Sequence, residues 1–161
     1  MERYQELLAE MDRSFKTADH LTYVTYRLVN ELKLLMNILE NLDKSLKAGM
    51  NALLEYDRLY KRIGPLPTEF TLRFEVFQRK LVPRYKINPE ILDLIESLHD
   101  IVTYKKKSPM VFQRKDKYVI SNDRFRLKTV TINDVKNYLE KAKPFISRVR
   151  NILHRQDNVA T

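Results

Sequence analysis

The chain has 161 residues, and 30 Lys and Arg against 21 Asp and Glu give it a formal net charge of +9 at pH 7. This length suffices for a single domain that buries about 70% of its unfolded surface. The absence of cysteine excludes disulfides, thiolate nucleophiles and cysteine-ligated metals, and it fits a reducing, cytoplasmic setting. Only two glycines are present, which disfavours glycine-rich phosphate loops and favours long helices. No stretch predicts a transmembrane helix.

The N-terminal segment predicts an amphipathic helix. Its apolar residues recur at helical spacing and form one face, made of Leu7, Leu8, Met11, Phe15 and Ala18. The β-branched and aromatic run at 22–26 loses side-chain freedom in a helix, and Asn30 is suited to cap a new one. We therefore expect a break near residues 26–30.

The strongest pattern predicts one long helix over residues 28–62. Core residues alternate there in steps of three and four, as the a and d positions of a heptad repeat do: Leu28, Leu32, Leu35, Leu39, Leu42, Leu46, Gly49, Leu53, Tyr56 and Tyr60. Further apolar residues widen this face, which indicates more than one packing neighbour. The sequence GPLP at 64–67 is expected to end the helix, because Gly64 tolerates a left-handed conformation and proline cannot continue the hydrogen bonds.

Two shorter helices are predicted next. The first covers TEFTLRFEVFQRKLV at 68–82 and is expected to stop at Pro83; its apolar face is Phe70, Phe74, Phe77 and Leu81. The second begins at Asn88 and Pro89, a capping residue followed by a proline in the first turn. Its apolar residues are Ile91, Leu92, Ile95, Leu98, Ile101 and Val102.

Positive charge is concentrated in residues 104–128. The stretch YKKKSPMVFQRKDKYVISNDRFRLK holds nine Lys and Arg against two acids, so it carries +7 of the formal +9. The runs at 110–112 and 118–120 favour strands, and 124–130 alternates charged and apolar residues with period two. A small basic β-hairpin or three-stranded element is therefore predicted over residues 104–130, which we call the basic element.

A C-terminal helix is predicted to begin at Thr131, because Asp134 follows three residues later, as in a capping box. Little in the tail QDNVAT can be buried, so we expect a single helical domain over 1–155 and a frayed tail over 156–161. The predicted fold class is mainly α: a helical bundle around one long heptad-patterned helix, with a small basic β-hairpin-like insertion before the C-terminal helix.

Two stretches, ADHLTYVTYRLVNELKLL at 18–35 and SPMVFQRKDKYVISNDRFRLKTV at 108–130, resemble a set of small archaeal helical proteins of about this length. The similarity extends over most of the chain. The resemblance implies an archaeal, cytoplasmic setting, and it carries no activity and no site residues with it.

The basic element predicts non-catalytic binding of RNA or of a ribonucleoprotein surface. Clustered cations displace counterions from phosphate backbones and give affinity that does not depend on sequence, while interspersed aromatic residues can stack on unpaired bases. The predicted contact residues are Lys105, Lys106, Lys107, Arg114, Lys115, Lys117, Tyr118, Arg124, Phe125, Arg126 and Lys128. The competing interpretation is a solvated charged surface whose aromatic residues face the core.

Two alternatives belong to other classes. A helical scaffold would dock the basic element on an acidic protein partner, and an exposed part of the heptad face would serve as a homodimer seam or a groove for a partner helix. The sequence RVRNILH resembles the Arg-to-His motif of HEPN-domain ribonucleases, which implies an all-helical dimer with Arg148 and His154 as catalytic residues. Val149 departs from that motif, in which a polar residue often follows the arginine.

The sequence offers few residues for a metal site or for nucleophilic catalysis. Glu96 and His99 have the Glu-x-x-His spacing of half a di-iron carboxylate site, but no second such pair exists in the sequence. No serine or histidine stands in a recognisable nucleophile context. We therefore expect no metal and no cofactor, and the sequence favours binding over enzymatic activity without deciding between them.

Overall fold

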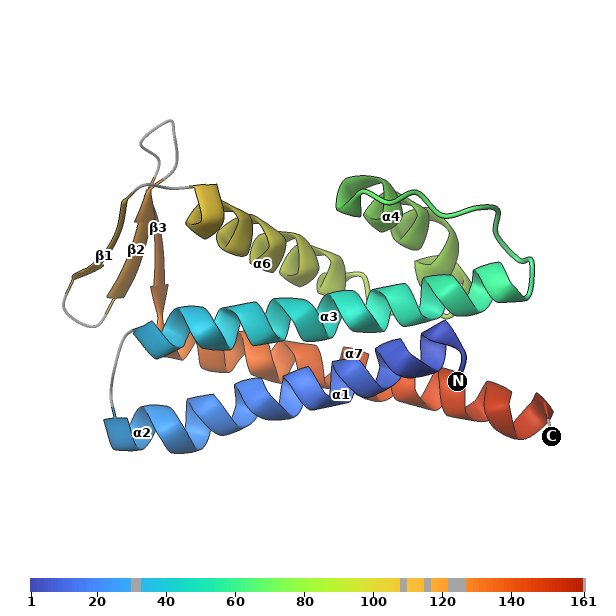
Figure 1. Ribbon diagram of the computed structural model, residues 1–161, viewed down its shortest axis with the longest axis horizontal. Helices are drawn as coiled ribbons and strands as arrows, with labels where there is room; N and C mark the ends of the chain where they lie inside the picture. Colours follow the sequence, from blue (N-terminus) through green and yellow to red (C-terminus); the bar gives the residue numbers. More distant parts are fainter. Residues whose placement is uncertain (30–32, 108–109, 115–116, 122–126, 161) are drawn as a thin grey trace.

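A computed structural model describes residues 1–29, 33–107, 110–114, 117–121 and 127–160, with side chains described for 1–26, 28, 33–103 and 130–154. In these ranges the protein is mainly helical, with one small antiparallel sheet (Figure 1). The predicted fold class is thereby confirmed. None of the described helices is long and apolar enough to cross a bilayer.

The N-terminal helical segment ends at Val29, inside the range 26–30 where a break was predicted, and the predicted cap Asn30 lies outside the described residues. Helix α1 (Arg3–His20) passes through a π-helical turn, η1 (Leu21–Thr25), into α2 (Tyr26–Val29), so the β-branched run does not interrupt it. The predicted face of α1 packs along α3 (Lys33–Leu59), and the two helices are antiparallel (Figure 1). The hydroxyl of the buried Ser45 on α3 donates to the carbonyl of Met11 at 2.8 Å and fixes this pairing.

Helix α3 is the heptad-patterned helix at the centre of the bundle, in contact with α1, α6 and α7. Its predicted core positions from Leu35 to Tyr56 are buried, as expected. The predicted start at residue 28 is wrong, because Leu28 belongs to α2 and is 82% exposed. The heptad spacing of apolar residues continues from α2 into α3, so the spacing alone does not show where the long helix begins.

The end of α3 also differs from the expectation. The helix stops at Leu59, and the residue with positive φ is Lys61 (58°), not Gly64. The amide of Arg62 donates to the carbonyl of Asp57 at 2.8 Å and closes the helix end. Termination is thus completed before the Gly-Pro sequence is reached.

A short helical arm follows, made of α4 (Phe70–Val76), a second π-helical turn, η2 (Phe77–Leu81), and α5 (Val82–Arg84). Pro83 lies inside α5 and does not stop the segment before it. A proline is tolerated in the first turn of a helix, because the amide hydrogen that it lacks would have no helical acceptor there. Phe77 and Leu81 of the arm are fully buried.

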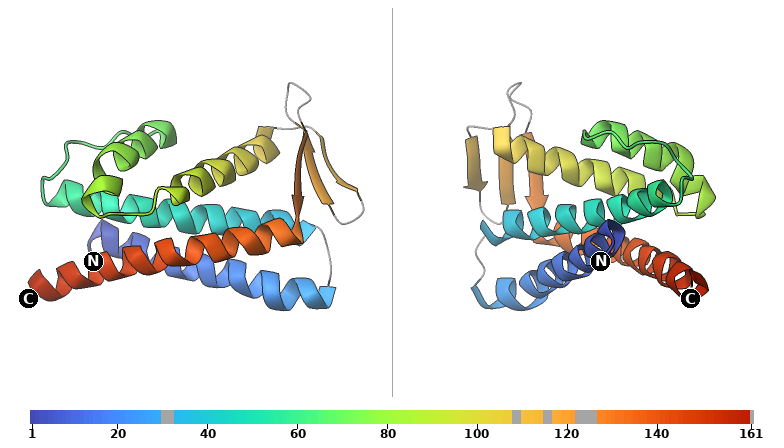
Figure 2. Two further views of the ribbon diagram at one scale, coloured as in Figure 1. Left: turned by 180° about the vertical axis from the view of Figure 1, so that it is seen from behind. Right: turned by 45° about the vertical axis from the view of Figure 1, so that its right-hand side comes forward.

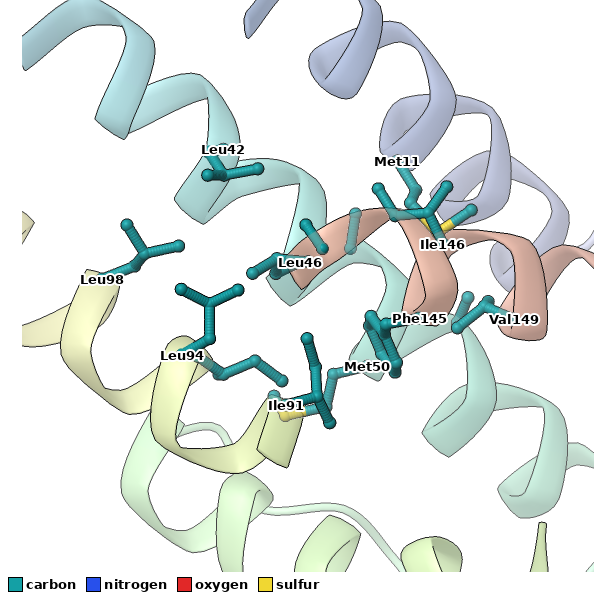
Figure 3. Close-up of a cluster of buried hydrophobic side chains, with 14 of the residues drawn as sticks. Met11, Leu42, Leu46, Met50, Ile91, Leu94, Leu98, Phe145, Ile146 and Val149 are labelled. Atoms are coloured by element: carbon teal, nitrogen blue, oxygen red, sulfur yellow. The ribbon is translucent and has the colours of Figure 1, made fainter. Parts of the chain in front are cut away.

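Helices α6 (Glu90–Lys107) and α7 (Ile132–Ala160) complete the bundle. The carbonyl oxygen of the Asn88 side chain accepts from the amide of Glu90 at 3.1 Å, which confirms the predicted cap. Composition predicts a frayed tail after residue 155, whereas α7 continues through Ala160. Figure 3 shows side chains of α3, α6, α7 and α1 meeting in the core, with Met50 of α3 beside Ile91 and Phe145.

Residues 104–107, predicted as the start of the basic β-like element, belong to helix α6 instead. The described remainder of the basic element forms a three-stranded antiparallel sheet in the order β1 (Met110–Arg114), β2 (Lys117–Ser121) and β3 (Leu127–Thr131). It joins the end of α6 to the start of α7. Figures 1 and 2 place it at the end of the bundle opposite to both chain termini.

Candidate nucleic-acid interface

The sheet belongs to the bundle and is attached to it at both ends. Strand β2 contacts α6 and α3, and β3 contacts α7. Val130 of β3 is buried in the hydrophobic core. Strands β2 and β3 are therefore anchored to the helices.

The junction between β3 and α7 is a complete capping box. The amide of Thr131 donates to the Asp134 carboxylate at 3.0 Å, and the amide of Asp134 donates to the Thr131 hydroxyl at 3.2 Å. This confirms the predicted helix start, and it satisfies two amide groups at the point where strand becomes helix. Together with Val130 it anchors the last strand.

Strand register places the predicted contact residues in rows. Arg114 pairs with Lys117, which pairs in turn with Thr131, whereas Tyr118 pairs with Val130. Successive residues of a strand alternate between the two faces of a sheet. Arg114 and Lys117 therefore hold positions on the face opposite to that of the buried Val130, while Tyr118 and Lys128 hold positions on the Val130 face.

The remaining predicted contact residues divide into two sets. Lys105, Lys106 and Lys107 are the last three residues of α6, directly before the sheet. The other residues, Lys115, Arg124, Phe125 and Arg126, lie outside the described residues. The backbone thus brings the lysines of α6 and the cations of the strands to one end of the molecule.

Arg148 and His154, the motif similar to HEPN ribonucleases, both lie on α7. The Arg148 guanidinium is half-buried, and Nη2 donates to the carbonyl oxygen of Tyr85 at 2.7 Å, whereas His154 is exposed. Six positions on an α-helix place two residues about 120° apart around the axis. Arg148 therefore hydrogen-bonds within its own chain and does not share a helix face with His154.

His99 contacts a lysine and an aromatic ring. Its Nδ1 lies 2.8 Å from Lys47 Nζ, and its ring stacks on Phe70 with centroids 3.9 Å apart. Glu96, its partner in the sequence motif, is exposed. Among the described residues, no group of three or more His, Asp and Glu side chains is arranged to hold a metal ion.

The Lys47–His99 contact was not predicted from the sequence. The two residues are 52 positions apart, on α3 and α6. Lys47 is close in sequence to leucines of the heptad pattern but is not one of the core positions, so the pattern predicts that it is exposed to solvent. No local signal in the sequence could have paired it with His99.

Comparisons of the chain with protein-family models, with curated proteins and with solved structures found no match.

Proposed function

We propose that the protein binds RNA, or the RNA surface of a ribonucleoprotein, through the basic element, without catalysing a reaction. The observation that carries the proposal is the confinement of charge. Residues 104–128 hold +7 of the formal +9, while the rest of the chain is close to neutral. A surface of this kind attracts phosphate backbones by releasing their counterions.

The placement of the element supports this function. A sheet at one end of the bundle is approachable by a long polyanion, and the capping box and Val130 anchor its last strand to the bundle. Arg114 and Lys117, paired across β1 and β2, hold positions on the face away from the core. RNA is favoured over sequence-specific DNA reading because the sequence has no helix-turn-helix with a basic recognition helix.

The test is a salt titration of binding to single-stranded RNA, structured RNA and duplex DNA with nuclease-treated protein. If about five cations meet phosphates, the logarithm of affinity falls with the logarithm of salt at a slope of roughly −3.5 for single strands to −4.5 for duplexes. The triple variant Arg114→Ala/Lys115→Ala/Lys117→Ala is expected to flatten the slope by about two units or more for all sequences alike.

A matched control has the same loss of charge elsewhere. Lys16, Lys80 and Lys143 are exposed residues on α1, η2 and α7, and their triple alanine variant is expected to keep the slope of the unmodified protein. Equal weakening by both variants would show that net charge, not the basic element, drives binding.

Other outcomes point to other functions. Absence of binding to all three nucleic acids at low salt overturns the proposal; a stoichiometric protein complex that survives nuclease would then indicate an acidic protein partner. Cleavage of RNA by a dimer, abolished by His154→Ala with the fold intact, would instead indicate a HEPN-like ribonuclease.

A further inference from the structure

A cavity of about 300 Å³ lies between the start of α6 and the middle of α7. Its walls come from the turn that precedes α6, from the first turn of α6, and from the residues 141–148 of α7. At about 1.5 Å per residue, the 14 positions of α6 from Ile91 to Lys105 separate this cavity from the basic element by roughly 21 Å. The cavity is therefore distinct from the proposed RNA surface.

The inner wall of the cavity is apolar and belongs to the hydrophobic core. Ile91 and Phe145 line it and are only 5% and 4% exposed. Both appear in Figure 3 beside Met50, so their positions are set by packing. Ile87 and Pro144 extend this wall, and an occupant would gain affinity by covering it.

The rim is cationic. Lys86, Lys141 and Arg148 line the cavity, and Glu90 is the acid among its described lining residues, which leaves a net charge of +2. Lys86 and Lys141 are exposed, so their ammonium groups can turn toward an occupant. The contact of Arg148 with the Tyr85 carbonyl holds that guanidinium in place, and its five N–H donors are more than one carbonyl can use.

We propose that this cavity binds a small organic monoanion with a compact apolar body, such as an aromatic or short-chain carboxylate. Ligand sites typically measure about 300–1,000 Å³ and combine apolar walls with a few polar groups. The volume here is at the lower end of that range, which fits one ring system or a short acyl chain. The acid group lies against Lys86, Lys141 and Arg148, and the apolar body lies against Ile91 and Phe145.

The test is isothermal calorimetry with 2-naphthoate, using 2-naphthylmethanol as the neutral and 2-naphthylmethylamine as the cationic analogue. Naphthoate is expected to bind at sub-millimolar concentration and about tenfold or more tightly than the alcohol, the value of one charge-assisted hydrogen bond. Amide chemical shifts of Ile91 and Phe145 are expected to move on titration.

Variants that remove positive charge and variants that remove negative charge at the rim are expected to change naphthoate affinity in opposite directions. Lys86→Gln/Lys141→Gln is expected to weaken naphthoate binding about tenfold or more, whereas Glu90→Gln, which removes the acid at the rim, is expected to strengthen it. Lys143→Gln is the matched control, because Lys143 is exposed on the same helix and does not line the cavity. RNA binding is expected to be unchanged in all of them.

The proposal is overturned if naphthoate fails to bind at millimolar concentration, or if the three analogues bind equally. It is also overturned if Lys143→Gln weakens binding as much as the rim variant does. Thermal denaturation of each variant confirms that the exposed substitutions leave the fold intact.

Discussion

Lys47 Nζ lies 2.8 Å from Nδ1 of His99, and this contact joins α3 to α6. An ammonium group can only donate, so Nδ1 accepts and the imidazole is neutral with its proton on Nε2. Burial of the ring and the charge of Lys47 lower the pKa of His99, against the opposing effect of Asp43, Asp100 and Glu96. Phe70 of α4 stacks on the imidazole ring of His99, and the centroid of the Phe70 ring lies 4.8 Å from Lys47 Nζ.

This contact predicts a pH dependence of stability. Because the pKa of His99 is lower in the folded protein than its ordinary value of about 6.5, protonation favours the unfolded chain. The stabilising contribution is present above pH ~6.5 and is lost as pH falls through the folded pKa. The free energy of unfolding, measured by urea denaturation, is expected to fall between pH 7.5 and a pH below 6. This decrease is expected to be smaller for His99→Gln than for the unmodified protein.

The matching control is Lys47→Met, which removes the neighbouring charge but keeps an apolar stem. The pKa of His99, followed by NMR titration, is expected to rise in this variant. An unchanged pKa would mean that Lys47 does not contact the imidazole in solution.

The buried carboxylate of Asp57 predicts a large loss of stability on truncation. Asp57 is fully buried, accepts from Arg84 and from the Tyr85 hydroxyl, and lies 3.7 Å from Arg62. Asp57→Ala is expected to cost about 2–3 kcal/mol, because it removes charge-assisted hydrogen bonds and leaves the Tyr85 hydroxyl without its acceptor, whereas Arg62 and Arg84 are exposed enough to be hydrated. Tyr85→Phe is expected to cost about 1–2 kcal/mol, the value of one hydrogen bond.

The measurement for both variants is the free energy of unfolding, obtained by chemical denaturation. The control is Arg79→Ala, which breaks the exposed pair with Glu75 and is expected to change stability by less than about 1 kcal/mol. A cost for Asp57→Ala no larger than that of the control would show that the carboxylate is solvated.

At Gly49, helix α3 packs closely against side chains of α1 and α7. A Cβ at this position would lie 2.9 Å from Met11 Sδ and 3.1 Å from Phe145 Cε2. Alanine is the better helix former by about 0.5–1 kcal/mol, but overpacking costs about 1–3 kcal/mol. Since side chains of both α1 and α7 would have to move, Gly49→Ala is expected to lower the thermal midpoint.

Gly64 provides the opposite case. A Cβ there meets no atom within 4 Å, and its φ is not positive. Gly64→Ala is expected to leave stability unchanged or to raise it by about 0.4–1 kcal/mol through the unfolded state. Equal thermal midpoints for the two alanine variants would refute the close packing at Gly49.

The capping box at residues 131–134 predicts a local effect on the sheet. Asp134→Ala removes the acceptor of the Thr131 amide and is expected to cost about 0.5–2 kcal/mol. Hydrogen exchange of the β3 amides is expected to accelerate more than that of the α1 amides. Uniform acceleration across the protein would mean that this junction does not anchor the strand.

Features that depend on neighbouring residues were predictable from the sequence. The heptad positions from Leu35 to Tyr56, the Asn88 cap, the Thr131–Asp134 capping box and the three strands all follow from local spacing, and each is found in the structure. The concentration of charge in residues 104–128 is likewise a property of composition alone. Local patterns sufficed because hydrogen bonds of caps and turns join residues only a few positions apart.

Contacts between distant residues were decided by the tertiary structure. The pairing of Lys47 with His99, the burial of Asp57 and the cavity between α6 and α7 join elements that the sequence separates by tens of residues. The exposure of Leu28, although it continues the heptad spacing, depends on where α2 ends and α3 begins. A periodic pattern records which face of a helix is apolar, but the identity of what covers that face depends on how the helices pack.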